Sequence, residues 1–225
     1  MSEDASTLAS TSTTAGRPGD VLVLTKPLGV GVALAANAAG GAPPGLHEAA
    51  VASMEAPNDA AAAAALEAGV RCATEIGELG LLGHLRALVA ASGVGAVIRV
   101  DRLPVLEGAV TAVAAGHAPE EAGRNRDDAA EWIDFDESII EDARTLMFDP
   151  QTGGGLLLAV PRQRLSDVLA ALGAQGVQGA AIGQLIPEPV GRIGVVSPVN
   201  RLGPTGGSGR TARAPEGQGT PPPNS

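Results

Sequence analysis

Aromatic residues are almost absent from this sequence. Its 225 residues include one tryptophan, two phenylalanines and no tyrosine, at Trp132, Phe135 and Phe148. Apolar residues still make up 44% of the chain, which is enough for it to fold rather than stay disordered. We therefore expect a core built from Ala, Val, Leu and Ile, with Gly where two backbones approach closely.

Paired cysteines, long apolar runs and an excess of positive charge are also missing. The single cysteine, Cys72, excludes an internal disulfide framework and fits a reducing compartment. No apolar run reaches the ~18 residues that a membrane-spanning helix needs, and the start of the chain has no signal pattern. The net charge of -10 argues against nucleic acid and anionic membrane as partners. These absences predict a cytoplasmic protein.

Composition divides the chain into three parts. Eight of the first 14 residues are Ser or Thr, and Gly and Pro supply 11 of the last 23. Neither end holds enough apolar surface to offset the entropy of ordering it. We expect a disordered leader at residues 1–18, a folded domain at residues 19–199 and a disordered tail at residues 200–225.

Within the folded part, strands and helices are mixed without strict alternation. Short aliphatic runs predict strands at residues 21–24, 97–100, 156–160, 181–186 and 193–196. Four segments predict helices. Two are Ala-rich, one before Gly40 and one that starts at Asn58 and ends at Gly69. The other two carry apolar residues at helical spacing, over 81–89 and over 165–172, and Gly173 is expected to stop the last one. This order predicts an α+β fold, a mixed sheet with packed helices.

Two polar segments next to the predicted strands are candidates for a site. Lys26, in Thr-Lys-Pro-Leu-Gly at residues 25–29, lies at a strand end, where ligands gather, although an exposed lysine is often only solvated. Residues 149–155, Asp-Pro-Gln-Thr-Gly-Gly-Gly, could cradle an anion with their N–H groups. The alternative interpretation of the same segment is a tight turn that needs glycine. Asn58 is interpreted as a helix cap.

In their order and separation, these segments resemble the carboxy-terminal domain of selenophosphate synthetase (selenide, water dikinase), of the aminoimidazole-ribonucleotide-synthetase-like superfamily. The Leu-Leu-Gly-His at residues 81–84, just after Thr74 and Glu75, adds to the resemblance, which covers about residues 17–196. Members of that family make selenophosphate from selenide and ATP with magnesium. Their reactive Cys or selenocysteine lies in an amino-terminal domain that no segment here resembles, so Cys72 is in the wrong half.

The resemblance implies site residues and cofactors, Mg2+ and ATP. The implied nucleotide-binding residues are Lys26, Asn58, Asp149, Gln151, Thr152 and Gly153, and the implied metal ligand is Glu75. In the family, the segment matching residues 74–80 reads Thr-Asp-Val-Thr-Gly-Phe-Gly, whose Asp helps to hold magnesium. Here Glu75 keeps a carboxylate, but Gly77 replaces a Thr and Glu78 replaces a Gly, which adds repulsion toward a polyphosphate. The alternative interpretation of Glu75 and Glu78 is that both are solvated carboxylates. His84 is interpreted as a packed or capping residue.

The resemblance implies a phosphotransferase of the selenide, water dikinase type, with no catalytic residue in this chain and no turnover by the chain alone. The alternative is a non-catalytic binding or regulatory module derived from that family. The expected partner is a separate amino-terminal synthetase domain, or a second copy of the chain bound through the face that such a domain would cover.

Overall fold

The computed structural model describes residues 15–198. The predicted leader overlaps this range at residues 15–18, where Gly16 is buried and its backbone N–H donates to Ser92 Oγ at 2.9 Å. The rest of the predicted leader and the predicted tail, residues 200–225, lie outside the described residues.

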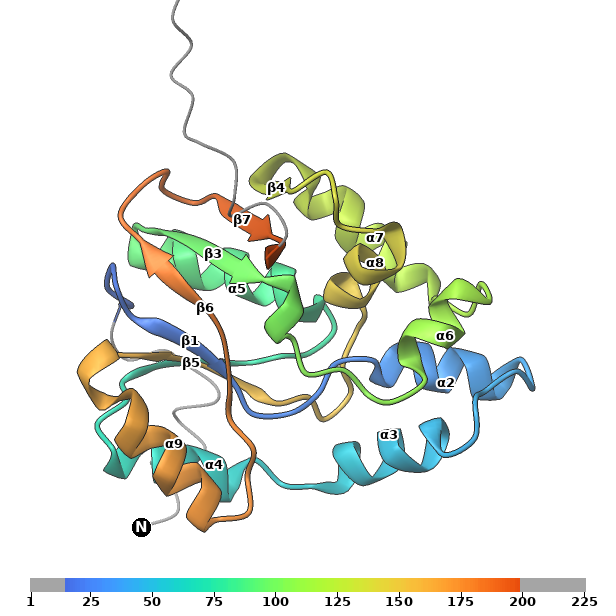
Figure 1. The fold of residues 1–225 in the computed structure, drawn as a ribbon, viewed down its shortest axis with the longest axis horizontal. Helices are drawn as coiled ribbons and strands as arrows, with labels where there is room; N and C mark the ends of the chain where they lie inside the picture. The colour runs from blue at the N-terminus through green and yellow to red at the C-terminus, as the bar shows by residue number, and fades with distance from the viewer. Residues whose placement is uncertain (1–14, 199–225) are drawn as a thin grey trace, which may run out of the picture.

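Seven strands in the described range form one mixed sheet in the order β2-β5-β1-β6-β3-β7-β4 (Figure 1). The strands are β1 (Val21–Leu24), β2 (Cys72–Glu75), β3 (Gly95–Arg99), β4 (Ile133–Phe135), β5 (Leu156–Val160), β6 (Ala180–Ile186) and β7 (Ile193–Val196). Strands β1 and β2 both pair antiparallel with β5, and β6 pairs antiparallel with β1 and β3. Strand β7 runs parallel to both β3 and β4. The predicted α+β class is confirmed.

The two central aliphatic runs became strands that are buried along their whole length. Every residue of β1 and β5 is buried, as expected for continuous apolar strands covered on both faces. The sequence did not predict β2 or β4, which are short edge strands of mixed polarity. Val100, predicted within a strand, instead begins the short 3-10 helix η1 (Val100–Arg102) after β3.

Eight α-helices surround the sheet in the described range, and they include the four that the sequence predicted. They are α2 (Val30–Ala38), α3 (Leu46–Glu55), α4 (Asp59–Glu67), α5 (Gly80–Ser92), α6 (Ala109–Ala114), α7 (Glu120–Ala129), α8 (Glu141–Phe148) and α9 (Leu165–Ala174). Gly173 does not stop the last helix as predicted, because α9 runs through it to Ala174. None of the helices in residues 15–198 is long and apolar enough to cross a membrane.

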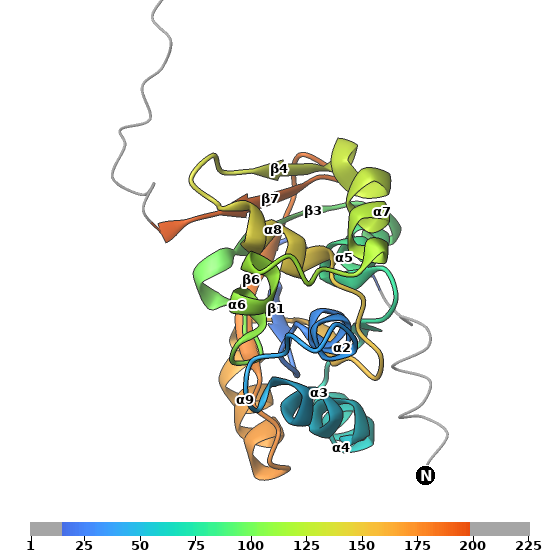
Figure 2. The ribbon, with the colours of Figure 1, turned by 90° about the vertical axis from the view of Figure 1, so that its right-hand side faces the viewer.

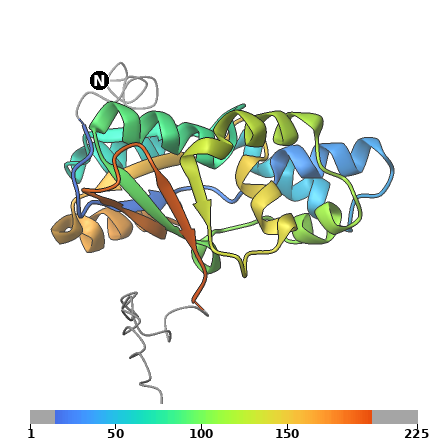
Figure 3. The same ribbon diagram turned by 90° about the horizontal axis from the view of Figure 1, so that it is seen from above.

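The helices divide the core into three clusters. Helix α5 covers one face of the sheet (Figure 3), while α4 and α9 lie together on the other face and cover its β2-β5-β1 part (Figure 1). Helices α2, α3 and α6 pack together in a third cluster beyond the end of β1 (Figures 1 and 2). As expected, aliphatic residues and alanine dominate the buried set, and Phe148 is its one large aromatic member in the described range.

Candidate functional site

Three segments that are distant in sequence meet at one end of the sheet. They are residues 25–29 after β1, residues 75–80 from the last residue of β2 onward, and residues 149–155 before β5. We call this meeting point the junction, and we call residues 152–155 within it the glycine turn. Because β1 and β2 flank β5 and run antiparallel to it, their ends meet its start. Backbone hydrogen bonds join the segments, from Thr25 N–H to Leu156 O (3.1 Å), from Ile76 N–H to Gly155 O (2.8 Å) and from Gln151 N–H to Gly77 O (3.0 Å).

Asp149 and Gln151 cap helix α2 from the far side of the junction. The residue before the helix is Gly29, which has a φ of 115° and no side chain with which to cap. Instead, Gly31 N–H donates to Asp149 Oδ2 at 3.0 Å, and Val30 N–H donates to Gln151 Oε1 at 3.3 Å. Both side chains are buried, so in this structure they satisfy the protein's own helix.

The carboxyl group of Asp149 is buried without a full set of partners. Burial raises the pKa of Asp149 to about 7, against the opposing effect of hydrogen bonds from Gln151 Nε2 and from the Gly31 N–H. Its second oxygen, Oδ1, is buried without a hydrogen-bond partner. This pKa places the protonation change of Asp149 near neutral pH.

The glycines of residues 153–155 lie directly against other backbone segments. Gly153 has a φ of 58°, and a Cβ on it would lie 2.8 Å from Met54 O. A Cβ on Gly155 would lie 2.6 Å from Lys26 N, and one on Gly154 would collide with Ile76 O. Close packing of backbones accounts for these glycines, as in the tight-turn interpretation. Thr152, at the tip of the turn, is exposed.

Lys26 joins three carbonyl groups. Its Nζ donates to Ser53 O (3.0 Å), Ala56 O (2.5 Å) and Gly153 O (2.8 Å), which uses all three of its N–H groups. Burial lowers the pKa of Lys26, and the negative charge of Glu75 partly offsets this effect. The ammonium group thus ties the end of α3 to the glycine turn, and it is not the freely solvated lysine that one interpretation of the sequence predicted.

Asn58 begins α4 as predicted, but the prediction that its side chain caps the helix was wrong. No side-chain cap bond is made, and Nδ2 donates instead to Gly154 O at 2.8 Å. The side-chain oxygen that would accept a capping bond, Oδ1, is buried without a hydrogen-bond partner. His84 matches its packed interpretation: Nε2 accepts the Gly77 N–H at 3.0 Å, and burial lowers its pKa.

Sequence reasoning missed Asn125 as a member of the junction. Its Nδ2 donates to Glu78 O (2.7 Å) and to Phe148 O (3.0 Å), so α7 ties residues 75–80 to the end of α8, directly before residues 149–155. The available signal was the Gly-Arg-Asn at residues 123–125, which belongs to the resemblance with the synthetase family.

Glu75 is half-buried at the end of β2, whereas Glu78 is exposed. Among residues 15–198 there is no group of three His, Cys, Asp or Glu side chains that could hold a metal ion. Magnesium requires several convergent oxygen ligands, so the carboxylates described here do not complete a magnesium site.

Comparison with known proteins shows the family. The family model described as AIR synthase related protein, C-terminal domain, matches residues 17–196, and the chain belongs to this family. Within it, the chain is 39% identical over 176 residues to the selenide, water dikinase of Pelobacter propionicus, covering 78% of this chain and 51% of that protein. The enzyme of the same name from Carboxydothermus hydrogenoformans is 37% identical, with 74% and 48% covered. The resemblance stated from the sequence is confirmed.

Solved structures show the same fold at low sequence identity. Hydrogenase maturation protein HypE superimposes with a TM-score of 0.60 at 15% identity, covering 82% of this chain and 51% of that one. Thiamine-monophosphate kinase from Stenotrophomonas maltophilia gives 0.56 at 17% identity, covering 80% and 51%. The chain spans about half the length of the curated relatives it matches.

Proposed function

We propose that this chain supplies the carboxy-terminal half of a selenide, water dikinase, which forms selenophosphate from selenide and ATP. Turnover then depends on an amino-terminal domain that carries the reactive groups. The observation that supports this most is the junction, where the segments typical of that family converge through main-chain bonds and buried side chains. A cytoplasmic location, in line with the single Cys72, is part of the proposal.

In this proposal, the junction residues divide into two roles. Lys26, Asn58, Asp149 and Gln151 are positioning residues, because each bonds to protein groups within the junction. Thr152 and Glu75 are more accessible and would face the nucleotide. HypE, which shares the fold, has been solved in complex with ATP, at a TM-score of 0.59 and 16% identity. Magnesium would need oxygen ligands beyond Glu75, from the nucleotide or the amino-terminal domain.

The second candidate function is a non-catalytic binding or regulatory module. Glu78 favours it, because this exposed carboxylate stands in the loop between β2 and α5, where the family has glycine. A negative side chain at this place repels a polyphosphate.

Complementation separates the two functions. The chain is mixed with the amino-terminal half of the Pelobacter propionicus relative, and selenide-dependent AMP formation is measured. We expect no turnover from either half alone and clear turnover from the mixture, because the catalytic groups and the junction are then both present. The matched control replaces this chain with the carboxy-terminal half of the same relative. If that control is active while the mixture with this chain stays inactive, the non-catalytic function is favoured.

A further inference from the structure

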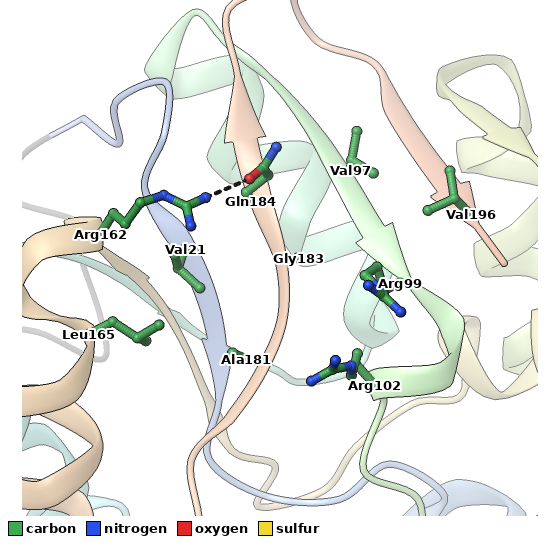
Figure 4. A pocket seen from close by; sticks show the side chains of 10 residues that line it. All are labelled: Val21, Val97, Arg99, Arg102, Arg162, Leu165, Ala181, Gly183, Gln184 and Val196. Atoms are coloured by element: carbon green, nitrogen blue, oxygen red, sulfur yellow. Dashed lines mark hydrogen bonds between the residues drawn. The ribbon is translucent and has the colours of Figure 1, made fainter. Parts of the chain in front are cut away.

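A pocket of about 270 Å³ opens on the face of the sheet opposite α5 (Figure 4). On β3, Ala96 and Ile98 are buried in the cluster with α5, so Val97 and Arg99, which alternate with them, point to the other face. Helices α4 and α9 cover this second face only over the β2-β5-β1 part. The lining residues are Val21, Val97, Arg99, Arg102, Arg162, Leu165, Ala181, Gly183, Gln184 and Val196. None of them belongs to the junction.

The lining of this pocket is basic in an acidic protein. Three arginines line it and no Asp or Glu does, although the chain carries a net charge of -10. Arg99 forms a two-point pair with Asp101, through Nε to Oδ1 (3.1 Å) and Nη2 to Oδ2 (2.8 Å). The same carboxylate lies 3.6 Å from Nε of Arg102. The three arginines contribute a charge of +3 and the carboxylate of Asp101 contributes -1, so the net charge at the pocket is +2.

The arginines approach the pocket from opposite sides. Arg162 comes from the turn before α9, and its Nη2 donates to Gln184 Oε1 at 2.8 Å, which holds the guanidinium over β6. Arg99 and Arg102 stand across β6 from it, at the end of β3 and in the turn that follows (Figure 4). Between them lie Val21, Ala181 and Gly183, while Val97 and Leu165 add apolar side chains to the lining (Figure 4).

We propose that this pocket binds a small phosphate monoester, with the phosphate between Arg102 and Arg162 and the apolar body on the sheet floor. Guanidinium groups match phosphate oxygens in geometry and keep their charge at all physiological pH values, and a charge of +2 balances a phosphate dianion. The volume lies just below the usual range for small-molecule sites, which favours a ligand with a compact body.

The test measures binding of phenyl phosphate to the whole chain. Inorganic phosphate and phenol, the two parts of that ligand, are tested separately for comparison. Calorimetry measures affinity, and amide chemical shifts locate the ligand. We expect phenyl phosphate to bind more tightly than either half and to shift the amides of Val97, Gly183 and Gln184. Arg102→Gln and Arg162→Gln should each weaken binding about tenfold or more, since each removes a charge-assisted contact.

Arg164→Gln is the matched control. Arg164 lies in the same turn as Arg162, outside the pocket, and its side chain is 59% exposed, like that of Arg102 at 58%. The control should keep the wild-type affinity. The proposal is overturned if millimolar phenyl phosphate gives neither heat nor shifts. It is also overturned if Arg164→Gln weakens binding as much as the pocket variants do, or if inorganic phosphate binds as tightly as phenyl phosphate. Because the chain is tested alone and the pocket shares no residue with the junction, these outcomes do not depend on the proposed dikinase function.

Discussion

Asp149 makes the free energy of unfolding of this protein depend on pH. Burial raises its pKa from 3.8 to about 7, so between these values the unfolded chain has released the proton while the folded chain still holds it. The contribution of Asp149 to stability is therefore complete below about pH 4 and is lost as the pH rises through 7. The full loss amounts to roughly 4 kcal/mol in the free energy of unfolding.

Asp149→Asn removes this titration and keeps the shape of the protonated side chain. We expect the free energy of unfolding of the wild type to fall, relative to that of the variant, by roughly 4 kcal/mol between pH 4 and pH 8. Urea unfolding of both proteins at several pH values measures the difference. A difference that stays constant over this range would contradict the raised pKa.

Lys26, the only lysine in the sequence, makes a second prediction at the residue scale. Lys26→Met keeps the aliphatic stem and removes the three donors to Ser53 O, Ala56 O and Gly153 O. We expect unfolding to become easier by about 2–3 kcal/mol, measured by denaturant titration, because charged hydrogen bonds are lost. Arg164→Met, which removes an exposed charge paired with Asp167, should change stability by less than about 0.5 kcal/mol. If Lys26→Met leaves stability unchanged and lowers only the activity of the complemented enzyme, Lys26 serves the nucleotide instead.

At the scale of elements, the glycine turn depends on backbone contact between β5, β2 and α3. Gly154→Ala places a Cβ against Ile76 O, where both partners are buried backbone. We expect it to destabilise the protein by about 2–3 kcal/mol or more, because neither segment can move away without breaking the bonds between β2 and β5.

Gly173→Ala is the control for this substitution. Gly173 lies in α9 with no atom near its added Cβ, so alanine should stabilise the protein by up to about 1 kcal/mol through helix propensity. Thermal unfolding of both variants measures the opposite signs. Equal effects at the two positions would remove the packing explanation for the turn.

At the scale of the whole molecule, Leu79 marks the surface that we expect the amino-terminal half to cover. It is 49% exposed and stands beside the junction, at the start of α5. Leu79→Glu should weaken binding between the two halves about tenfold or more, since it replaces buried apolar area with a charge. Val190→Glu is the control, because Val190 is similarly exposed at 50% but lies in the turn between β6 and β7. Calorimetric titration of one half into the other compares the variants, and equal losses would place the interface elsewhere.

The same surface carries the alternative partner, a second copy of the chain. Sedimentation at increasing concentration should then show dimers that Leu79→Glu disperses. A monomer at every concentration leaves the amino-terminal half as the partner for this face.

The sequence by itself determined the elements whose signal is local. Continuous aliphatic runs specified β1 and β5, and the leucine stripe specified α5, because apolar spacing alone selects these structures. It did not reveal β2 and β4, since short edge strands take their conformation from the neighbours with which they pair. The family was also readable from the sequence, because its segments keep their residue types and order.

Only the tertiary structure decided what the site residues do. Sequence reasoning placed Lys26, Asn58, Asp149 and Gln151 in a binding site, and the structure brings all four to the junction. Their partners, however, are carbonyl and N–H groups up to about 130 residues away along the chain, as for Lys26 Nζ and Gly153 O, 127 residues apart. Such partners exist only after β1, β2 and β5 have paired, so no local pattern could assign them. The residue types and their order thus determined the family. The hydrogen-bond partners of the site residues were determined by the backbone groups that the paired strands bring close to them.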